Sequence, residues 1–142
     1  MKCALIAMLT LLTLSAPAQE LERTPAPDGA NVYIISPAHG EVVSNPVTVR
    51  FGLSEMGVAP AGIKADAAGH HHLLINVADD AMPPFNRPLP ATDRIRHFGG
   101  GQTEVVLELP PGPHTLQLLL GDHLHIPHDP PVISKPISII VR

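Results

Sequence analysis

Histidine is the residue type best suited to chemistry in this chain, and it is concentrated in two short segments. The first segment, Gly69 to Ile75, reads GHHHLLI, and the second, Gly121 to Pro131, reads GDHLHIPHDPP. Together they hold six of the nine histidines, and each contains a His-x-His pair. Residues i and i+2 of a strand point to the same face and lie roughly 6.6 Å apart. Each segment can therefore present two imidazole rings side by side.

Two such pairs, brought together, would form a nitrogen-rich metal site. Zn²⁺ and Cu²⁺ bind imidazole nitrogen at roughly 2.0–2.1 Å, and three or four nitrogens make a strong site without thiolate. Asp122 and Asp129 flank the second segment and could orient the rings or bind the metal directly. The predicted ligands are His70, His72, His123 and His125, followed by His128 and His97.

The composition favours Cu(II) as the bound metal, with Zn(II) next. The only cysteine is Cys3, and the only methionines beyond the N-terminal segment are Met56 and Met82. Cu(I) and Fe–S centres are built on soft sulfur ligands. The chain lacks enough such side chains for a centre of either kind.

Strand alternation divides the histidine triplet into two groups. In the strand expected over residues 71–77, His71 shares the register of Ile75. We therefore expect His71 on the core side, with its ring bonded to a backbone carbonyl. His70 and His72 fall on the opposite face, where we expect an accessible pair.

The second pair depends on how the next strand ends. The strand expected over residues 114–120 places Leu116 on its core side. If this strand runs unbroken through Gly121, His123 and His125 share the opposite face. Both His-x-His pairs would then lie on the non-core side near strand ends, as an accessible metal site requires.

Two other functions are compatible with the same residues. Histidines beside Gly, Asp and Pro often tie loops together through ring N–H bonds to backbone carbonyls. The domain would then be a metal-free structural or interaction module. An open metal site could instead serve a hydrolase or a redox enzyme. The chain has no nucleophile elbow and no complete phosphate-loop motif, so we assign no catalytic residue and expect a non-catalytic domain.

The N-terminus has the parts of a signal peptide. Lys2 is followed by the apolar run Cys3 to Leu14 and by a small-residue site, APA, that ends at Ala18. We expect residues 1–18 to be cleaved off, which predicts a periplasmic or secreted protein with no membrane span after cleavage. An envelope protein is a candidate partner beside the metal ion. A net charge of −4 without a basic patch argues against nucleic acid.

The remaining chain predicts a short leader and one β domain. Residues 19–30 are polar and Pro-containing, which indicates a flexible leader, and residues 31–142 predict a single domain. With 17 prolines and 11 glycines, the composition favours short strands and turns. Residues 78–102 predict a long loop without regular structure. Strands are expected over residues 31–36, 42–43, 47–53, 71–77, 103–109, 114–120 and 133–141.

About seven such strands indicate an all-β fold, a small antiparallel immunoglobulin-like β-sandwich. Five longer motifs add a family resemblance: MGVAPAG (Met56 to Gly62), GHHHLLI (Gly69 to Ile75), HFGGGQTE (His97 to Glu104), LPPGPHTLQLLLGDH (Leu109 to His123) and IPHDPPV (Ile126 to Val132). In this combination the chain resembles the bacterial domain-of-unknown-function family 4399. The resemblance covers nearly all of the chain after the predicted signal peptide. It implies a periplasmic domain and brings no established activity.

Overall fold

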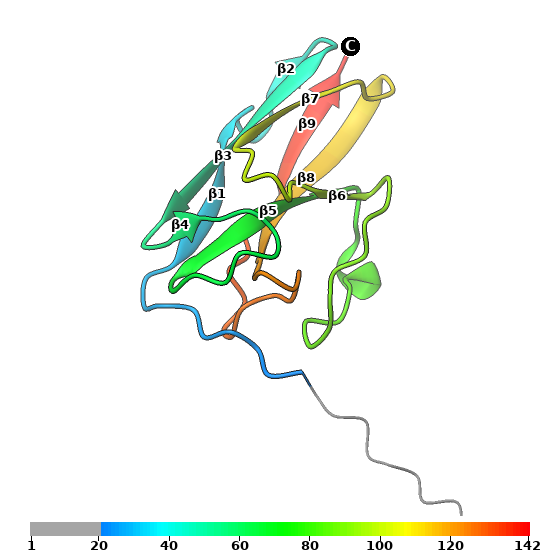
Figure 1. Ribbon diagram of the computed structural model, residues 1–142. Coiled ribbons are helices and arrows are strands. Elements are labelled where there is room, and N and C mark those ends of the chain that lie inside the picture. Colours follow the sequence, from blue (N-terminus) through cyan, green and yellow to red (C-terminus); the bar gives the residue numbers. More distant parts are fainter. Residues whose placement is uncertain (1–20) are drawn as a thin grey trace, which may run out of the picture.

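The computed structural model describes residues 21–142, which form two β-sheets packed face to face (Figure 1). The smaller sheet has the order β1-β3-β7, with bounds Asn31–Ser36, Val47–Ser54 and Glu104–Leu107. The larger sheet has the order β2-β9-β8-β5-β4, with bounds Val42–Val43, Ile137–Val141, Gly112–Gly121, Ala68–Ile75 and Gly57–Val58; β6 (Ile95–His97) also pairs with β5. The predicted all-β sandwich is confirmed. The predicted signal peptide lies outside the described residues.

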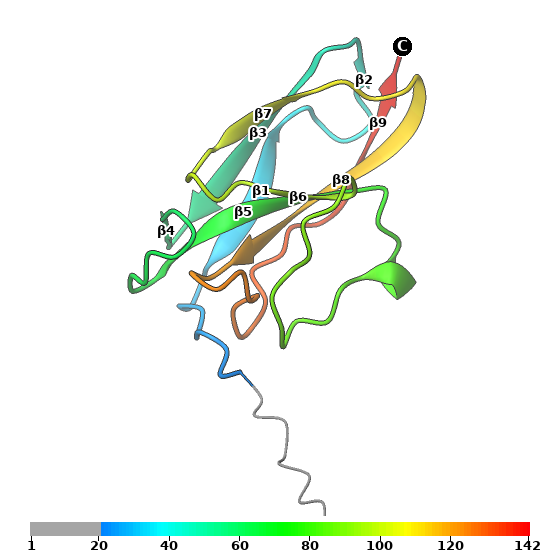
Figure 2. The ribbon, with the colours of Figure 1, turned by 45° about the vertical axis from the view of Figure 1, so that its right-hand side comes forward.

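The strand order matches the immunoglobulin arrangement. The order β1-β3-β7 corresponds to strands A-B-E, and β9-β8-β5-β6 corresponds to G-F-C-C′. β5 and β8 run side by side through the larger sheet (Figure 2). The pairings are antiparallel apart from the short parallel pairs β2–β9 and β4–β5. Within residues 21–142, no helix is long and apolar enough to cross a membrane.

Alternating apolar side chains from the strands of both sheets form the core between them. β3 contributes Val49 and Phe51, and β8 contributes Leu116 and Leu118, all of them buried. His71 of β5 faces the same side, with its ring centroid 5.1 Å from that of Phe51. The predicted core-side position of His71 is therefore confirmed.

A second apolar cluster covers the outer face of the larger sheet. Leu74 of β5 and Leu119 of β8 pack there against Leu89, which lies in the connection from β5 to β7. That connection was predicted to lack regular structure over residues 78–102, and this prediction is wrong. It contains a 3-10 turn, η1 (Asp79–Ala81), and the strand β6. Three residues are too few for alternation to reveal a strand, and pairing with β5 supplies the order.

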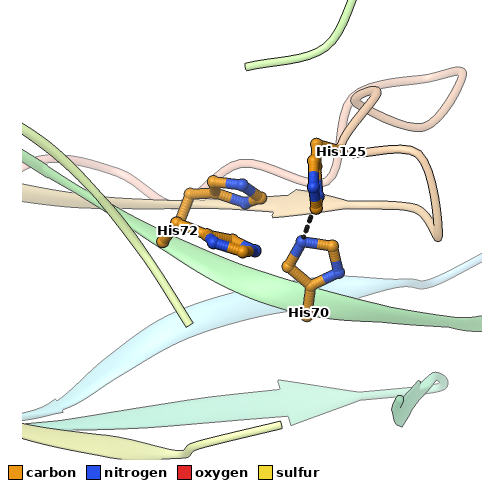
Figure 3. A group of neighbouring side chains, drawn as sticks. His70, His72 and His125 are labelled. Atoms are coloured by element: carbon orange, nitrogen blue, oxygen red, sulfur yellow. Dashed lines mark hydrogen bonds between the residues drawn. The ribbon is translucent and has the colours of Figure 1, made fainter. Parts of the chain in front are cut away.

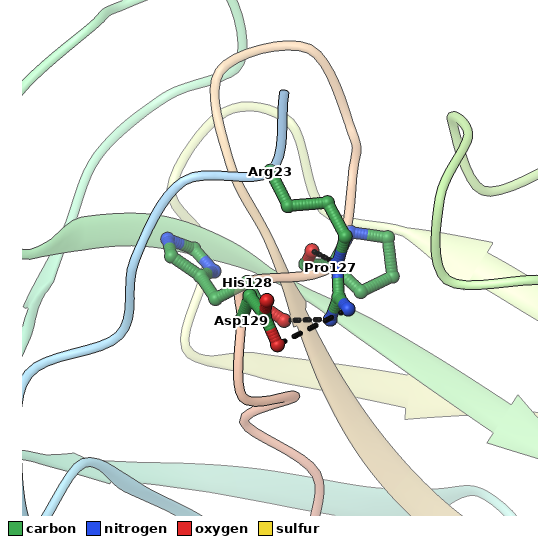
Figure 4. Close-up of polar contacts among 4 residues, drawn as sticks. All are labelled: Arg23, Pro127, His128 and Asp129. Atoms are coloured by element: carbon green, nitrogen blue, oxygen red, sulfur yellow. Dashed lines mark hydrogen bonds and ion pairs between the residues drawn. The ribbon is translucent and has the colours of Figure 1, made fainter. Parts of the chain in front are cut away.

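The described part of the leader is docked on the domain. Pro25 forms a bridge with Asp129, and the Ala26 N–H donates to the Asp129 carbonyl at 2.9 Å. Arg23 forms an ion pair with Asp129 at 3.2 Å and also donates to the carbonyl oxygens of Pro127 and His128 (Figure 4). The leader expected over residues 19–30 is thus anchored from Arg23 onward.

Candidate metal centre

β5 places His70 and His72 on the outer face of the larger sheet, opposite to His71. Both are buried, with exposed fractions of 0% and 1%, so the predicted accessible pair must be corrected. Alternation assigns a side chain to one face of a strand but does not reveal what covers that face. Here the rings of His97 and His125 lie against those of His70 and His72. The loop before β6 covers the neighbouring part of this face and meets the segment after β8, where the Leu89 N–H donates to the His125 carbonyl at 2.9 Å.

β6 brings His97 to the same place. His97 is directly opposite His72 in the β5–β6 pairing, and the two ring centroids are 5.2 Å apart with an interplanar angle of 29°. A Cβ on Gly99 would lie 2.4 Å from Cε1 of His97. Glycine at position 99 therefore leaves the space that the His97 ring occupies. The sequence ranked His97 last among the candidates, because no pattern showed that β6 pairs with β5.

The segment after β8 supplies His125 but not His123. β8 ends at Gly121, so the expected continuation of the strand is wrong and both histidines lie in a turn. The i, i+2 rule does not apply to a turn, and the two side chains need not share a face. His125 adopts a φ of 66°, and its N–H donates to the Asp122 carbonyl at 2.9 Å. Its ring reaches His70, whereas His123 lies outside the group.

Four imidazoles converge in what we call the histidine cluster: His70, His72, His97 and His125. Their ligand nitrogens all lie within 4.8 Å of one another. His70 Nε2 and His125 Nδ1 face each other at 3.1 Å (Figure 3). Two nitrogens bound to a tetrahedral Zn²⁺ with bonds of roughly 2.0–2.1 Å are separated by roughly 3.3 Å. The cluster could therefore hold a metal ion with nitrogen ligands alone.

Burial keeps three rings of the cluster neutral, those of His70, His72 and His125. It lowers the pKa of His70 to about 4, with smaller contributions from the charges of His125 and His97. Burial, followed by the charges of the other three cluster rings, lowers the pKa of His72 to about 3. The pKa of His125 is also lowered, first by burial and then by His97. At neutral pH these three rings are uncharged, and neutral imidazole is the form that binds metals.

His128 is buried but does not join the cluster. Its exposed fraction is 0%, and its Nε2 lies 3.3 Å from the Ala68 carbonyl. A Cβ on Gly69 would lie 2.9 Å from His128 Cε1, so this ring packs against the start of β5. Asp129 is paired with Arg23 instead of a histidine. Both residues join the leader and the segment after β8 to the sandwich.

His71 differs from the expected carbonyl-bonded ring. Neither of its ring nitrogens has a hydrogen-bond partner of normal geometry among residues 21–142. Burial lowers its pKa to about 4, and the nearby backbone of Gln102 opposes part of that effect. His71 thus sits in the core as a neutral ring packed on Phe51.

The comparisons with known proteins identify a family without an assigned activity. Neither a curated protein nor a solved structure matches the chain. A family model described as "Domain of unknown function (DUF4399)" matches residues 49–142. This range includes every member of the histidine cluster and the strands β5, β6 and β8 that position it. The chain belongs to the DUF4399 family.

Proposed function

We propose that this protein is an exported, non-catalytic domain that binds one divalent transition-metal ion in the histidine cluster. Cu(II) is the first candidate and Zn(II) the second, and the role is sequestration, delivery or sensing in the cell envelope. The observation that carries the proposal is the convergence of four ligand nitrogens within 4.8 Å of one another. The rings come from β5, β6 and the turn after β8, so tertiary structure and not local sequence brings them together.

The hydrogen bonding of the cluster rings differs from that of a fully paired metal-free scaffold. His114 shows how this fold satisfies a structural histidine: its Nε2 lies 2.8 Å from the Pro110 carbonyl and its Nδ1 lies 2.9 Å from Asn76 Nδ2. By contrast, Nδ1 of His70 and Nδ1 of His72 are buried without a hydrogen-bond partner among residues 21–142, as are both ring nitrogens of His71 and Nδ1 of His128. Unpaired nitrogens therefore do not by themselves mark a metal ligand, and the convergence of the four rings carries the proposal. Leaving a buried polar group unpaired costs about 1–3 kcal/mol. A scaffold of carbonyl-bonded rings would avoid this cost.

The ligand types support Cu(II) or Zn(II). All four cluster ligands are imidazoles, and imidazole suits both ions. The two described methionines, Met56 and Met82, pack against apolar clusters. Of the divalent first-row ions, Cu²⁺ binds a given nitrogen site most tightly, which places Cu(II) first.

The number of ligands supports binding without catalysis. Catalytic zinc sites use three protein ligands and keep the fourth position for water or substrate. Four imidazoles in this cluster would fill a tetrahedral coordination sphere. Export is supported by the predicted signal peptide over residues 1–18, whose apolar run and small-residue cleavage site precede the domain.

Elemental analysis and metal titration test the proposal, with two substitutions in one turn as a matched pair. The wild-type protein should bind one equivalent of Cu(II), or of Zn(II) with lower affinity. His125→Asn removes a cluster ligand and should lower the affinity by at least about 100-fold, beyond the 10–100-fold typical of an outer-shell partner. His123→Asn, two residues away and outside the cluster, should bind as the wild type does. Failure of the wild type to bind either ion would reject the proposal in favour of the metal-free scaffold.

A further inference from the structure

Asp122 holds the turn that carries His125, although it is not part of the histidine cluster. Its side chain is buried with an exposed fraction of 2%. Oδ1 accepts hydrogen bonds from the N–H of Leu124 at 2.8 Å and from the N–H of Ile126 at 3.0 Å. The Asp122 N–H also donates to the Ile126 carbonyl at 2.9 Å. These bonds close the turn on both sides of His125.

The second carboxylate oxygen is held from the leader. Thr24 Oγ1 donates to Asp122 Oδ2 at 2.7 Å. This contact joins residues 98 positions apart in the chain and is the contact through which the leader reaches the turn's central carboxylate. Burial alone would raise the pKa of Asp122, but the hydrogen bonds from Thr24, Ile126 and Leu124 lower it overall. The carboxylate is therefore ionised at neutral pH and needs its donors.

Thr24 is itself fixed in place. The Asp129 N–H donates to the Thr24 carbonyl at 2.9 Å, and the Ala26 N–H donates to the Asp129 carbonyl at 2.9 Å. On the other side of Thr24, Arg23 forms an ion pair with Asp129 and donates to the Pro127 carbonyl at 3.1 Å (Figure 4). The Thr24 hydroxyl is thus presented to Asp122 by a segment bonded to the chain just beyond the turn.

We propose that Thr24 is a positioning residue for the metal centre, acting through Asp122 to keep the His125 ring aimed at the other cluster histidines. The inference rests on the proposed metal-binding function. His125 has a φ of 66°, a left-handed conformation that a non-glycine residue keeps only when its surroundings hold it. Without the Thr24 hydroxyl, Oδ2 loses its donor, and the carboxylate that closes the turn is held only by the two bonds that Oδ1 accepts. The leader thereby becomes a functional part of the site.

The test compares three variants of the full chain. Thr24→Val keeps the side-chain shape and removes the hydroxyl, Thr24→Ser restores the hydroxyl, and Arg23→Gln loosens the same leader without touching Asp122. We expect Thr24→Val to weaken Cu(II) binding about 10-fold, the lower end of the effect of outer-shell partners, and to change the electron paramagnetic resonance spectrum of bound Cu(II). Thr24→Ser should have the Cu(II) affinity and the electron paramagnetic resonance spectrum of the wild type. Arg23→Gln should lower the unfolding temperature without changing the spectrum.

A metal-free measurement separates this inference from the proposed function. Ring signals of His125 in the nuclear magnetic resonance spectrum of the metal-free protein should shift in Thr24→Val and stay unchanged in Thr24→Ser. Unchanged ring signals in Thr24→Val would overturn the positioning role, whether or not the wild type binds metal. An equal loss of affinity in Arg23→Gln would overturn it too, because the leader would then act as a general tether. If Thr24→Val does not fold, Thr24→Ala provides the same comparison.

Discussion

His72 and His97 lie directly opposite each other across β5 and β6, with their rings stacked at a centroid distance of 5.2 Å. The two side chains differ in burial: His72 has an exposed fraction of 1%, whereas His97 is exposed. The cluster therefore has an interior, formed on β5, and one member at the surface on a three-residue strand. In the proposed function, the ion would enter and leave at His97.

Replacing His97 should separate metal binding from folding. The side chain is exposed, and surface substitutions usually change the free energy of unfolding by less than about 0.5 kcal/mol. We expect His97→Ala to keep the stability of the metal-free protein within that range and to lower metal affinity by at least about 100-fold, more than the loss of an outer-shell partner. Urea unfolding with a chelator and Cu(II) titration measure the two quantities.

His39→Ala is the matched control for His97→Ala. His39 is also exposed, and its Nδ1 accepts a hydrogen bond from the Ser138 N–H far from the cluster. The His39→Ala variant should bind metal with the affinity of the wild type. If the wild type and His97→Ala bind the metal with equal affinity, His97 is not a ligand of the site.

Gly99→Ala should disturb the metal site while leaving the fold intact. A Cβ at this position would lie 2.4 Å from His97 Cε1 and 3.2 Å from the Ala61 Cβ. The exposed His97 ring can swing away, whereas Ala61 must shift slightly. We expect a 10-fold or greater loss of metal affinity, in the range seen for residues that orient ligands, with only a small fall in the unfolding temperature. Gly57→Ala is the control, because its new Cβ would meet only the Ala67 carbonyl at 4.0 Å. Wild-type affinity in Gly99→Ala would show that the His97 ring is not fixed by this contact.

The sequence predicted the fold well because alternation reports burial directly. β3 and β8 read as alternating apolar runs, and both lie where their patterns place them. The same rule assigned His70 and His72 to one face of β5 and His71 to the other. It failed to predict that the outer face is buried, since the loop that covers it carries Leu89 among prolines and polar residues and shows no period.

The cluster itself could be predicted only in part. His70 and His72 share a face because strand geometry requires it, and a sequence contains that information. His97 and His125 arrive through the register of β6 on β5 and through a turn held by Asp122. Both are tertiary relationships, and no local spacing encodes them. This is why His123, two residues from His125, was ranked above His97.

Acid should destabilise the metal-free protein through its buried histidines. Burial first, with smaller contributions from other groups, lowers the pKa of His70 and of His71 to about 4 and that of His72 to about 3. The ordinary value is 6.5. Above that value these rings are neutral in both states, and their contribution to stability is complete. Below pH 6.5 the histidines of the unfolded chain bind protons, whereas the buried rings of the folded chain do not.

The free energy of unfolding should then fall by up to about 1.4 kcal/mol per pH unit for each such histidine. The fall should start near pH 6.5 and end where the folded rings protonate, at about pH 4 for His70 and His71. Urea unfolding in the presence of a chelator, between pH 8 and pH 5, measures it. A flat profile over this interval would show that the rings are not buried as described. With metal bound, the curve should lie higher at pH 7 and fall more steeply, because protons compete with the ion.

Leu89→Ala should loosen the loop before β6 and make the histidine cluster more accessible to water. Leu89 has an exposed fraction of 6%, packs against Leu74 and Leu119, and donates its N–H to the His125 carbonyl. Truncation of a buried leucine costs about 2–5 kcal/mol, and we expect the lower end because a loop can relax into the space. Water then reaches the rings of β5, which raises the pKa of His70 and His72 toward the ordinary value. A bound ion should also leave faster.

Two measurements on Leu89→Ala separate a loosened cover from a general loss of stability. Histidine pKa values come from pH titration of the ring signals, and the dissociation rate comes from transfer of bound Cu(II) to an excess of chelator. Val106→Ala is the control, because Val106 lies on the smaller sheet and is 60% exposed. It should change neither the histidine pKa values nor the dissociation rate. If Leu89→Ala is destabilised but keeps the wild-type pKa values and dissociation rate, burial of the cluster does not depend on this loop. The strand β6 and the turn after β8 must then exclude water from the cluster.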